Sequence, residues 1–551
     1  MSTAELRLPP TNDSAADIAF APELKKALHA RRVKDASKDA PPASAAASGL
    51  FSVLGDSGDG EIPAAAVAEA LKRQGIREDD PRIAASLRAL YAHPGPVTGE
   101  VCVSLFRENF SLIERTLKDR FIIPRFYEFE QEVGDIFERC ANVRGGAVAD
   151  YIPQLARVDP EHFAVAVTTI DGQHAAFGES DTPYCVQSSC KPINYAIALE
   201  ERGEKFVHRH VGREPSGRSF NELALNSSGL PHNPMINAGA IMCSSMIKPK
   251  APLADRFDHV MNIWKRLSGG EAPGFNNPVF LSEKATADRN FALAYFMQEK
   301  GAFPKGTNIL ETLDFYFQAC SIEVTARQMS VLAATLANAG VCPVTNERVF
   351  SNDTVKNCLS LMYSCGMYDF SGEFAFTIGL PAKSGVSGAL MVVVPQVMGF
   401  AIWSPRLDAL GNSVRGVEFC RELVKRFSLH NYDSLLNQPT KKDPTRRSVQ
   451  HRSDQIYQLI NAACLGDIDE ISRLIAHGAD INAADYDGRT PLHLAASEGR
   501  KDAVAFLVSR NANRMAKDRW GATPLDDAKR RNHVDLYDWL SAPLRSAETT
   551  Q

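Results

Sequence analysis

The 551-residue sequence lacks several patterns that would assign it to a class at once. No apolar run approaches the ~18–20 residues that cross a membrane as a helix, so a membrane-spanning protein is not expected. Its 11 cysteines contain no Cys-x-x-Cys pair, so no metal site is expected from them. No long basic run occurs, and 61 Lys and Arg stand against 66 Asp and Glu, so neither nucleic acid nor an anionic membrane is an expected partner.

Targeting signals are lacking as well. The sequence shows no secretory apolar region, and an odd number of cysteines then points to free thiols in a reducing compartment. Acidic residues come early, at Glu5, Asp13 and Asp17, whereas an organelle presequence is poor in acids and rich in arginine. We therefore expect a soluble, cytoplasmic protein, with mitochondria as the alternative if the source is eukaryotic.

The amino-terminal part divides into a tail and a helical domain. Residues 1–45 have little hydrophobic periodicity, which is typical of a disordered tail. Residues 46–125 have helical spacing and contain GDSGDGEIPAAA, Gly55–Ala66, which is similar to a calcium-binding helix–loop–helix. Gly55 at the first ligand position and Ala66 at the twelfth leave too few oxygen ligands for calcium. We expect an EF-hand-like helical domain without calcium.

The central region, residues 130–432, mixes strand and helix patterns. FAVAVTTIDG at 163–172 predicts a strand and a turn, and GALMVVVP followed by VMGFAIWSP predicts a hairpin around Pro395–Gln396. Helical periodicity fills the interval between them. Strands at both ends with helices between them predict an α/β sandwich with a mostly antiparallel sheet.

The carboxy-terminal part is a linker followed by repeats. Residues 433–454 are polar, charged and proline-bearing, as in a linker. In residues 455–545, DGRTPLHLAASEG and WGATPLDDAKRRN repeat at a spacing of 33 residues, with a degenerate unit before them. This period and the TPLH sequence resemble all-α ankyrin repeats, which stack to share a core. Such repeats imply a protein partner whose identity they do not specify.

The segment QSSCKP has the composition of a serine active site. Ser188 and Lys191 are three residues apart, so they share one face of a helix. Pro192 is tolerated only in a first turn, so we expect the helix to begin near Ser188. A serine hydroxyl needs a base, and a lysine serves when burial lowers its pKa.

A second element, Lys383-Ser384-Gly385, precedes a valine-rich strand, as the K-T-G strand does in penicillin-recognising serine enzymes. We expect Gly385 to permit close approach of the substrate to the sheet edge. The pair of motifs leaves another interpretation open, in which QSSCKP is an ordinary helix start with an exposed lysine.

The wider sequence resembles one family. Motifs shared with the glutaminases, the serine-dependent hydrolases of free L-glutamine, cover about residues 145–430: QSSCKP, EPSGRSFNE, PHNPMINAGAI, ADRNFALAYF, LDFYFQACSIEVT, SCGMYDFSGEFAF and LPAKSGVSG. The helical domain before them and the ankyrin repeats after them are similar to the layout of the long, kidney- and liver-type members.

This resemblance implies a fold related to the β-lactamases and penicillin-binding enzymes, and a hydrolysis of L-glutamine to L-glutamate and ammonia without a cofactor. Ser188 would attack the side-chain carboxamide to give a glutamyl ester. Lys191 would act as its base, with Tyr368 sharing the proton. The backbone N–H groups of Ser188 and Val386 would form the oxyanion hole.

The resemblance also implies the groups that hold the two ends of glutamine and the assembly of the chain. A carboxylate suits the ammonium, whereas amides and phenols suit the carboxylate. A homo-oligomer, either a dimer or a tetramer, is implied. The expected substrate-binding residues are Tyr151, Asn237, Glu283, Asn290 and Tyr316, together with Ser188, Tyr368 and Val386 of the reacting centre.

Each binding residue has an ordinary structural alternative. Asn237 would then cap a helix, Glu283 would be a surface charge and Tyr316 would belong to the core. At the level of the whole chain, the alternatives are a β-lactamase-like acyl-serine hydrolase and an ankyrin scaffold with an inactive hydrolase domain. The first predicts a secretory signal and an S-D-N loop, and the second predicts a lost site residue; the sequence shows neither.

Two departures from the family pattern stand out. Ser189 and Cys190 follow the expected nucleophile, where animal members commonly have Cys-Val. The segment at 220–234 lacks the phenylalanine and the acidic run that animal members carry before HNP. Phosphate activation is therefore not predicted for this chain.

Overall fold

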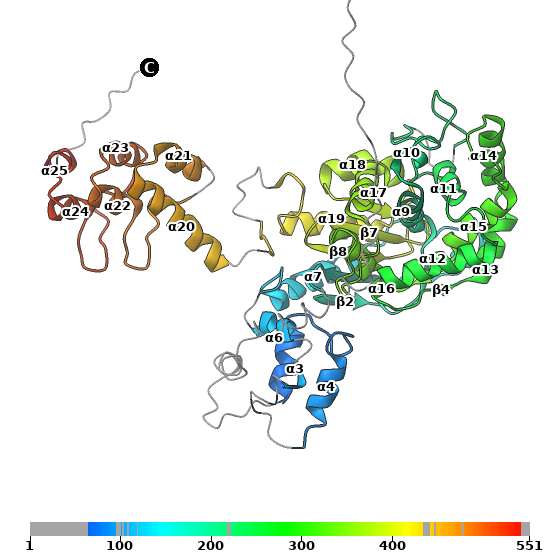
Figure 1. The fold of residues 1–551 in the computed structure, drawn as a ribbon, viewed down its shortest axis with the longest axis horizontal. Helices are drawn as coiled ribbons and strands as arrows, with labels where there is room; N and C mark the ends of the chain where they lie inside the picture. The colour runs from blue at the N-terminus through cyan, green and yellow to red at the C-terminus, as the bar shows by residue number, and fades with distance from the viewer. Residues whose placement is uncertain are drawn as a thin grey trace, which may run out of the picture.

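The computed structural model describes residues 64–94, 98, 101, 104–106, 110–117, 120–217, 222–433, 441–445, 448–476 and 479–541. The expected tail at 1–45 lies outside these residues, and so does most of the segment Gly55–Ala66, of which only the last three residues are described. Figure 1 shows a central α+β domain, with the amino-terminal helices along one side and a separate group of helices at the carboxy-terminal end.

A five-stranded antiparallel sheet forms the centre of the fold, in the order β2-β1-β8-β7-β6. The expected strand after residue 163 and the expected hairpin are both confirmed, with Val394 paired to Met398 across the turn. The strands are β1 Ala164–Thr169, β2 His174–Gly178, β6 Ala382–Ser384, β7 Ala389–Val394 and β8 Met398–Trp403.

Both faces of this sheet are covered by helices, which explains why its three central strands, β1, β8 and β7, are buried along their whole length. Helices α7 (Phe126–Ala141) and α19 (Val414–Arg426) pack on one face, and α16 (Ala326–Ala337) packs on the other. Thr325 and Gln328 start α16 with a reciprocal capping box. Gly399 lets α16 approach β8 closely, because an added Cβ there would lie 2.3 Å from the backbone of Ala333.

A helical lobe lies beyond α16 and carries a small second sheet in the order β3-β5-β4. This arrangement confirms the predicted α+β class with antiparallel pairing. The principal helices of the lobe are α9 Lys191–Arg202, α11 Asn237–Ser244, α12 Leu253–Leu267, α13 Asn277–Ala285, α14 Asp288–Glu299, α15 Ile309–Cys320 and α17 Asn352–Cys365. The short strands are β3 Tyr184–Cys185, β4 Gly274–Phe275 and β5 Ile322–Val324.

The amino-terminal helices α3 (Ala64–Arg73), α4 (Ala84–Tyr91) and α6 (Phe110–Leu117) share a small apolar core of their own. This helical domain contacts the turn between β1 and β2. Arg82 donates to the carbonyl oxygen of Asp171 at 2.7 Å, and the backbone N–H of His174, the first residue of edge strand β2, donates to the carbonyl oxygen of Gly75 at 2.7 Å.

The carboxy-terminal helices form three antiparallel pairs, as expected for two repeats and a degenerate one: α20 Ser448–Leu465, α21 Ile468–Ala476, α22 Pro491–Ser497, α23 Lys501–Ser509, α24 Pro524–Arg530 and α25 Val534–Ser541. The repeated threonines at 490 and 523 both start helices with capping boxes. Helix α20 begins at Ser448, inside the segment 433–454 that was expected to be linker. Lys442 of that segment bonds with the backbone of Arg426 and Ser428.

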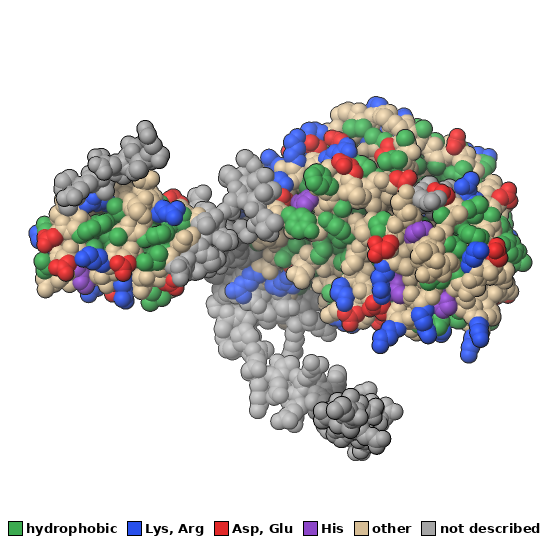
Figure 2. Space-filling view, turned by 90° about the horizontal axis from the view of Figure 1, so that it is seen from above, with side chains coloured by type: hydrophobic (Ala, Val, Ile, Leu, Met, Phe, Trp, Pro, Cys, Tyr) green, Lys and Arg blue, Asp and Glu red, His purple; other side chains and the backbone are tan. Residues whose placement is uncertain are grey.

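Surface charge is mixed rather than segregated. On the face shown in Figure 2, acidic and basic side chains lie interspersed over the central and the repeat regions. None of the described helices is both long enough and apolar enough to cross a membrane.

Candidate active site

The segment around Ser188 lies at the junction of the sheet and the helical lobe. Residues Gln187–Cys190 form a 3₁₀ turn and α9 begins at Lys191, so the regular helix starts slightly later than expected. Pro192 lies in its first turn, as predicted. Gln187 has φ +47°, which is uncommon for a residue with a side chain and is a mark of backbone strain near functional groups.

Ser188 and Lys191 face one another. The amine of Lys191 donates to the hydroxyl of Ser188 at 2.5 Å, and both side chains are buried. Burial lowers the pKa of the Lys191 amine, although the thiols of Cys320 and Cys190 and the carboxylate of Glu283 oppose this shift. The interpretation with an exposed lysine is therefore wrong. The geometry suits a lysine that accepts a proton from a serine.

Tyr368 lies behind Ser188 on a short 3₁₀ turn, with φ +54°. Its hydroxyl donates to the carbonyl oxygen of Ser384 at 3.1 Å. Burial raises the pKa of the phenol, and a hydrogen bond with Ser188 opposes this effect. The phenol is therefore protonated at neutral pH and within reach of the serine.

A cavity of about 320 Å³ opens in front of Ser188. Seven of the eight residues expected to bind substrate line it, and the eighth, Tyr368, lines an adjacent cavity. The residues that line the cavity in front of Ser188 are Tyr151, Gln187, Ser188, Asn237, Glu283, Thr286, Ala287, Arg289, Asn290, Tyr316, Cys320 and Val386.

One end of this cavity carries a buried carboxylate. Glu283, only 9% exposed, accepts hydrogen bonds from the hydroxyl of Tyr151 at 2.6 Å and from the side-chain amide of Gln187 at 3.0 Å. Burial raises the pKa of Glu283, while these two bonds and the charge of Lys191 lower it. A buried acceptor of this kind is suited to an ammonium ligand. It is not the surface charge that the ordinary alternative supposed.

Another part of the wall carries amides and a phenol. The side-chain amide of Asn237 donates to Asn290 Oδ1 at 3.0 Å, and the hydroxyl of Tyr316 donates to Asn237 Oδ1 at 3.3 Å. Asn237 is the first residue of α11, but its side chain makes these bonds rather than a helix cap. Tyr316 is buried, and its hydroxyl belongs to the polar network.

Gly385 lies where two protein segments come close together. An added Cβ at Gly385 would lie 2.8 Å from the carbonyl oxygen of Val186 and 3.1 Å from the hydroxyl of Ser189. The turn bearing Ser188 thus approaches the K-S-G strand closely at this point. The glycine sets the distance between Val386 and the serine.

Sequence reasoning assigned no individual role to three residues of the site. Gln187 orients Glu283, and Arg289 contributes a charge to the cavity wall. Lys383 is fully buried, with its amine 4.5 Å from the centre of the Tyr368 ring and bonded to the carbonyl oxygen of Ser384 at 2.7 Å. Burial and the nearby charge of Lys191 lower the pKa of Lys383. For Lys383, the signal available in the sequence was its position in the K-S-G motif.

Comparison with known families gives three matches along the chain. The glutaminase family pattern matches residues 146–432, an EF-hand domain pattern matches residues 46–124, and a pattern of three ankyrin repeats matches residues 418–549.

Among curated proteins, "Putative glutaminase 2" of Caenorhabditis elegans is 46% identical over 87% of this chain and 82% of its own length. "Glutaminase liver isoform, mitochondrial" of Rattus norvegicus is 45% identical over 90% of this chain and 84% of its own length. Both relatives extend well beyond the central domain.

Solved structures agree with these matches. The structure of "Probable glutaminase ybaS" is 37% identical, with a TM-score of 0.52, over 54% of this chain and 96% of that one. The structure of Mglu in its native form is 35% identical, also with a TM-score of 0.52, over 55% of this chain and 72% of that one. The chain therefore belongs to the glutaminase family, and it hydrolyses glutamine to glutamate.

Proposed function

We propose that this hydrolysis proceeds through an ester between Ser188 and the glutamyl group. The observation that carries the proposal is the 2.5 Å contact between the Lys191 amine and the Ser188 hydroxyl. It lies in a buried setting that lowers the pKa of the amine. A neutral lysine takes the serine proton as the serine oxygen bonds to the carboxamide carbon.

The negative charge that develops on the carboxamide oxygen needs nearby donors. We assign these to the backbone N–H groups of Ser188 and Val386, since both residues line the cavity and Gly385 brings their segments together. Each such donor is worth about 2.7–4 kcal/mol in a comparable hydrolase. The C–N bond then breaks, the leaving nitrogen takes the proton that Lys191 and Tyr368 hold, and ammonia departs. Water cleaves the ester and returns the proton to Ser188.

Substrate is held at its two charged ends. Glu283, oriented by Tyr151, accepts the ammonium of glutamine, and Asn237, Asn290 and Tyr316 hold its carboxylate. The hydrogen bonds described above support this division, because Glu283, the carboxylate in the cavity lining, bonds with Tyr151 and Gln187, whereas Asn237, Asn290 and Tyr316 bond with one another.

Trapping the ester tests the nucleophile directly. Enzyme mixed with glutamine and quenched in acid should gain the mass of a glutamyl group on the peptide that contains Ser188. Ser189→Ala is the matched control and should gain the same mass, whereas Ser188→Ala should gain none. An adduct on Ser189 would contradict the assignment. L-Asparagine and a cephalosporin, tested as substrates, distinguish a glutaminase from a β-lactamase-like enzyme.

The partners and the compartment of the chain are further proposals. We propose a homo-oligomer, a dimer or a tetramer, and a protein partner for the ankyrin repeats. Of the two compartments considered, mitochondria are favoured over the cytoplasm, because the rat relative carries that word in its name. Sedimentation of the purified chain tests the homo-oligomer. Fractionation of its source cells tests the compartment.

A further inference from the structure

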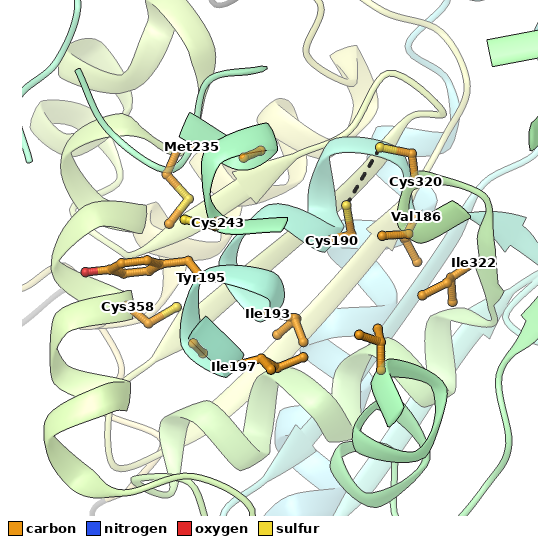
Figure 3. Close-up of a cluster of buried hydrophobic side chains, with 14 of the residues drawn as sticks. Val186, Cys190, Ile193, Tyr195, Ile197, Met235, Cys243, Cys320, Ile322 and Cys358 are labelled. Atoms are coloured by element: carbon orange, nitrogen blue, oxygen red, sulfur yellow. Dashed lines mark hydrogen bonds between the residues drawn. The ribbon is translucent and has the colours of Figure 1, made fainter. Parts of the chain in front are cut away.

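Two cysteines meet in the wall of the active site. Cys190 immediately precedes the first residue of α9, and Cys320 is the last residue of α15. Their sulfur atoms lie 3.8 Å apart, and Figure 3 shows the two side chains pointing toward one another. Cys190 is also one of the residues at which this chain departs from the family pattern.

This pair has access to solvent through the substrate cavity. Cys320 lines that cavity beside Ser188 and Tyr316, whereas Cys190 is fully buried behind it. A small oxidant that enters the empty site therefore meets the sulfur of Cys320 first. Bound glutamine or glutamate would cover it.

We propose that Cys190 and Cys320 are an oxidation site at which hydrogen peroxide forms a disulfide and thereby reversibly inactivates the enzyme. The inference rests on the proposed function in one respect, namely that Ser188 and Lys191 are the reacting groups. The formation of the disulfide itself does not depend on that assignment.

The chemistry requires two thiols and one peroxide. The hydrogen bond from Cys320 lowers the pKa of Cys190, whereas the same bond and burial raise the pKa of Cys320, so Cys190 is the member of the pair that loses a proton. Cys320 is the member of the pair that lines the cavity, and its proton passes to the Cys190 thiolate as its sulfur attacks the peroxide. An S–O bond forms, the O–O bond breaks, and the hydroxide released takes the proton from Cys190.

The second step closes the disulfide. The thiolate of Cys190 attacks the sulfenic sulfur of Cys320, an S–S bond forms and the S–O bond breaks. The departing hydroxide takes up the proton that the pair first lost. In sum, two thiols lose two electrons, and one peroxide is reduced to two waters.

The disulfide would distort the catalytic pair. A disulfide holds its sulfurs about 2.05 Å apart, so the 3.8 Å contact must shorten. Cys190 is adjacent to Lys191, and Cys320 lies one helical turn after Tyr316, so the shift is transmitted to both sides of the serine. A displacement of about 1 Å at reacting groups lowers turnover about 100-fold.

The test uses the full chain with hydrogen peroxide. Ammonia release should fall about 100-fold, dithiothreitol should restore it, and peptide mass spectrometry should find the 190–320 disulfide. Glutamate present during oxidation should slow the loss. Cys190→Val, with Cys190→Ser as a second variant, should keep basal activity and lose the thiol-reversible inactivation. Cys420→Ala, at a buried cysteine of α19 on the other face of the sheet, is the matched control and should behave as the unchanged chain does.

Two results would overturn the proposal. One is inactivation of Cys190→Val and Cys190→Ser at the unchanged rate, with recovery by dithiothreitol. The other is formation of the 190–320 disulfide with full activity retained. If instead Ser188→Ala kept its activity while the disulfide still formed, the assignment of the nucleophile would fail and the oxidation site would stand.

Discussion

Helices α9 and α22 both begin with a proline in the first turn, but their surroundings differ. At α22, Thr490 and His493 form a reciprocal capping box. At α9, no side chain caps the helix, the preceding turn is strained at Gln187, and the first residue is a buried lysine whose pKa is lowered. The start of α22, with its capping side chains, stabilises the fold. The start of α9, which is uncapped and follows a strained turn, lies at the reacting centre.

Replacing the serine at the strained helix start should have the largest effect. Ser188→Ala should lower kcat by about 10⁶-fold, as loss of the serine does in a comparable hydrolase. The free energy of unfolding should hardly change, because the hydroxyl contributes little packing. Ammonia release and urea denaturation measure the two effects. The neighbouring Ser189→Ala is the control, and a dead Ser189→Ala with an active Ser188→Ala would reverse the assignment.

The protonation of Lys191 gives the next largest effect. Burial lowers its pKa, and only the neutral amine accepts a proton, so kcat should rise with pH by about tenfold per unit until the amine is neutral. Above that point kcat should level off. At saturating glutamine the ammonium of the bound substrate keeps Glu283 ionised. The pH dependence of kcat therefore reports the titration of Lys191 alone. A flat kcat from about pH 6 to pH 9, with chemistry rate-limiting, would argue against this base.

The buried amine of Lys383 should affect stability rather than the reaction. An amine whose pKa is lowered on folding opposes folding. The unfolded chain binds a proton at this lysine that the folded chain does not hold, so stability falls as pH falls below about 10.4. Lys383→Met removes that dependence, and its stability relative to the unchanged chain should increase toward lower pH. The exposed Lys425→Met is the control. Equal pH dependence in both variants would show that Lys383 keeps its proton on folding.

A capping threonine of the repeats should affect stability alone. Thr523→Ala removes the hydroxyl that accepts the backbone N–H of Asp526. It should lower the stability of the repeat region by about 1 kcal/mol. Glutamine hydrolysis should be unchanged, since no proposed site residue lies beyond Val386. Thermal unfolding and the ammonia assay check this, and a loss of activity would tie the repeats to the site.

The smallest effect is expected from removing the repeats altogether. A chain that ends after Thr445 keeps the contacts of Lys442 with the catalytic domain. Its kcat/KM should stay within about twofold of the full chain, as for distant, independent regions. If this shortened chain folds by circular dichroism but is inactive, the repeats order the site or an assembly that it needs.

Patterns within short stretches of the sequence predicted the structures formed by residues close together in the chain. The apolar runs on either side of Pro395 gave the hairpin, the 33-residue period gave the repeats, and the three-residue spacing placed Lys191 against Ser188. The contact between Tyr151 and Glu283 joins residues 132 apart in the sequence, and no local pattern carries such a pairing. Only the family resemblance predicted that both residues belong to the same binding site. It gave no role to Gln187 or Lys383.

The helical domain contacts the turn between β1 and β2. Truncation at the amino-terminal end should therefore affect the central domain more than truncation at the carboxy-terminal end. Strand β2 is the edge of the sheet, and Gly75 and Arg82 cover its beginning. Removing the amino-terminal helices would expose this edge, and uncovered edge strands are templates for aggregation. A shortened catalytic domain should therefore keep its helical domain to stay soluble during purification.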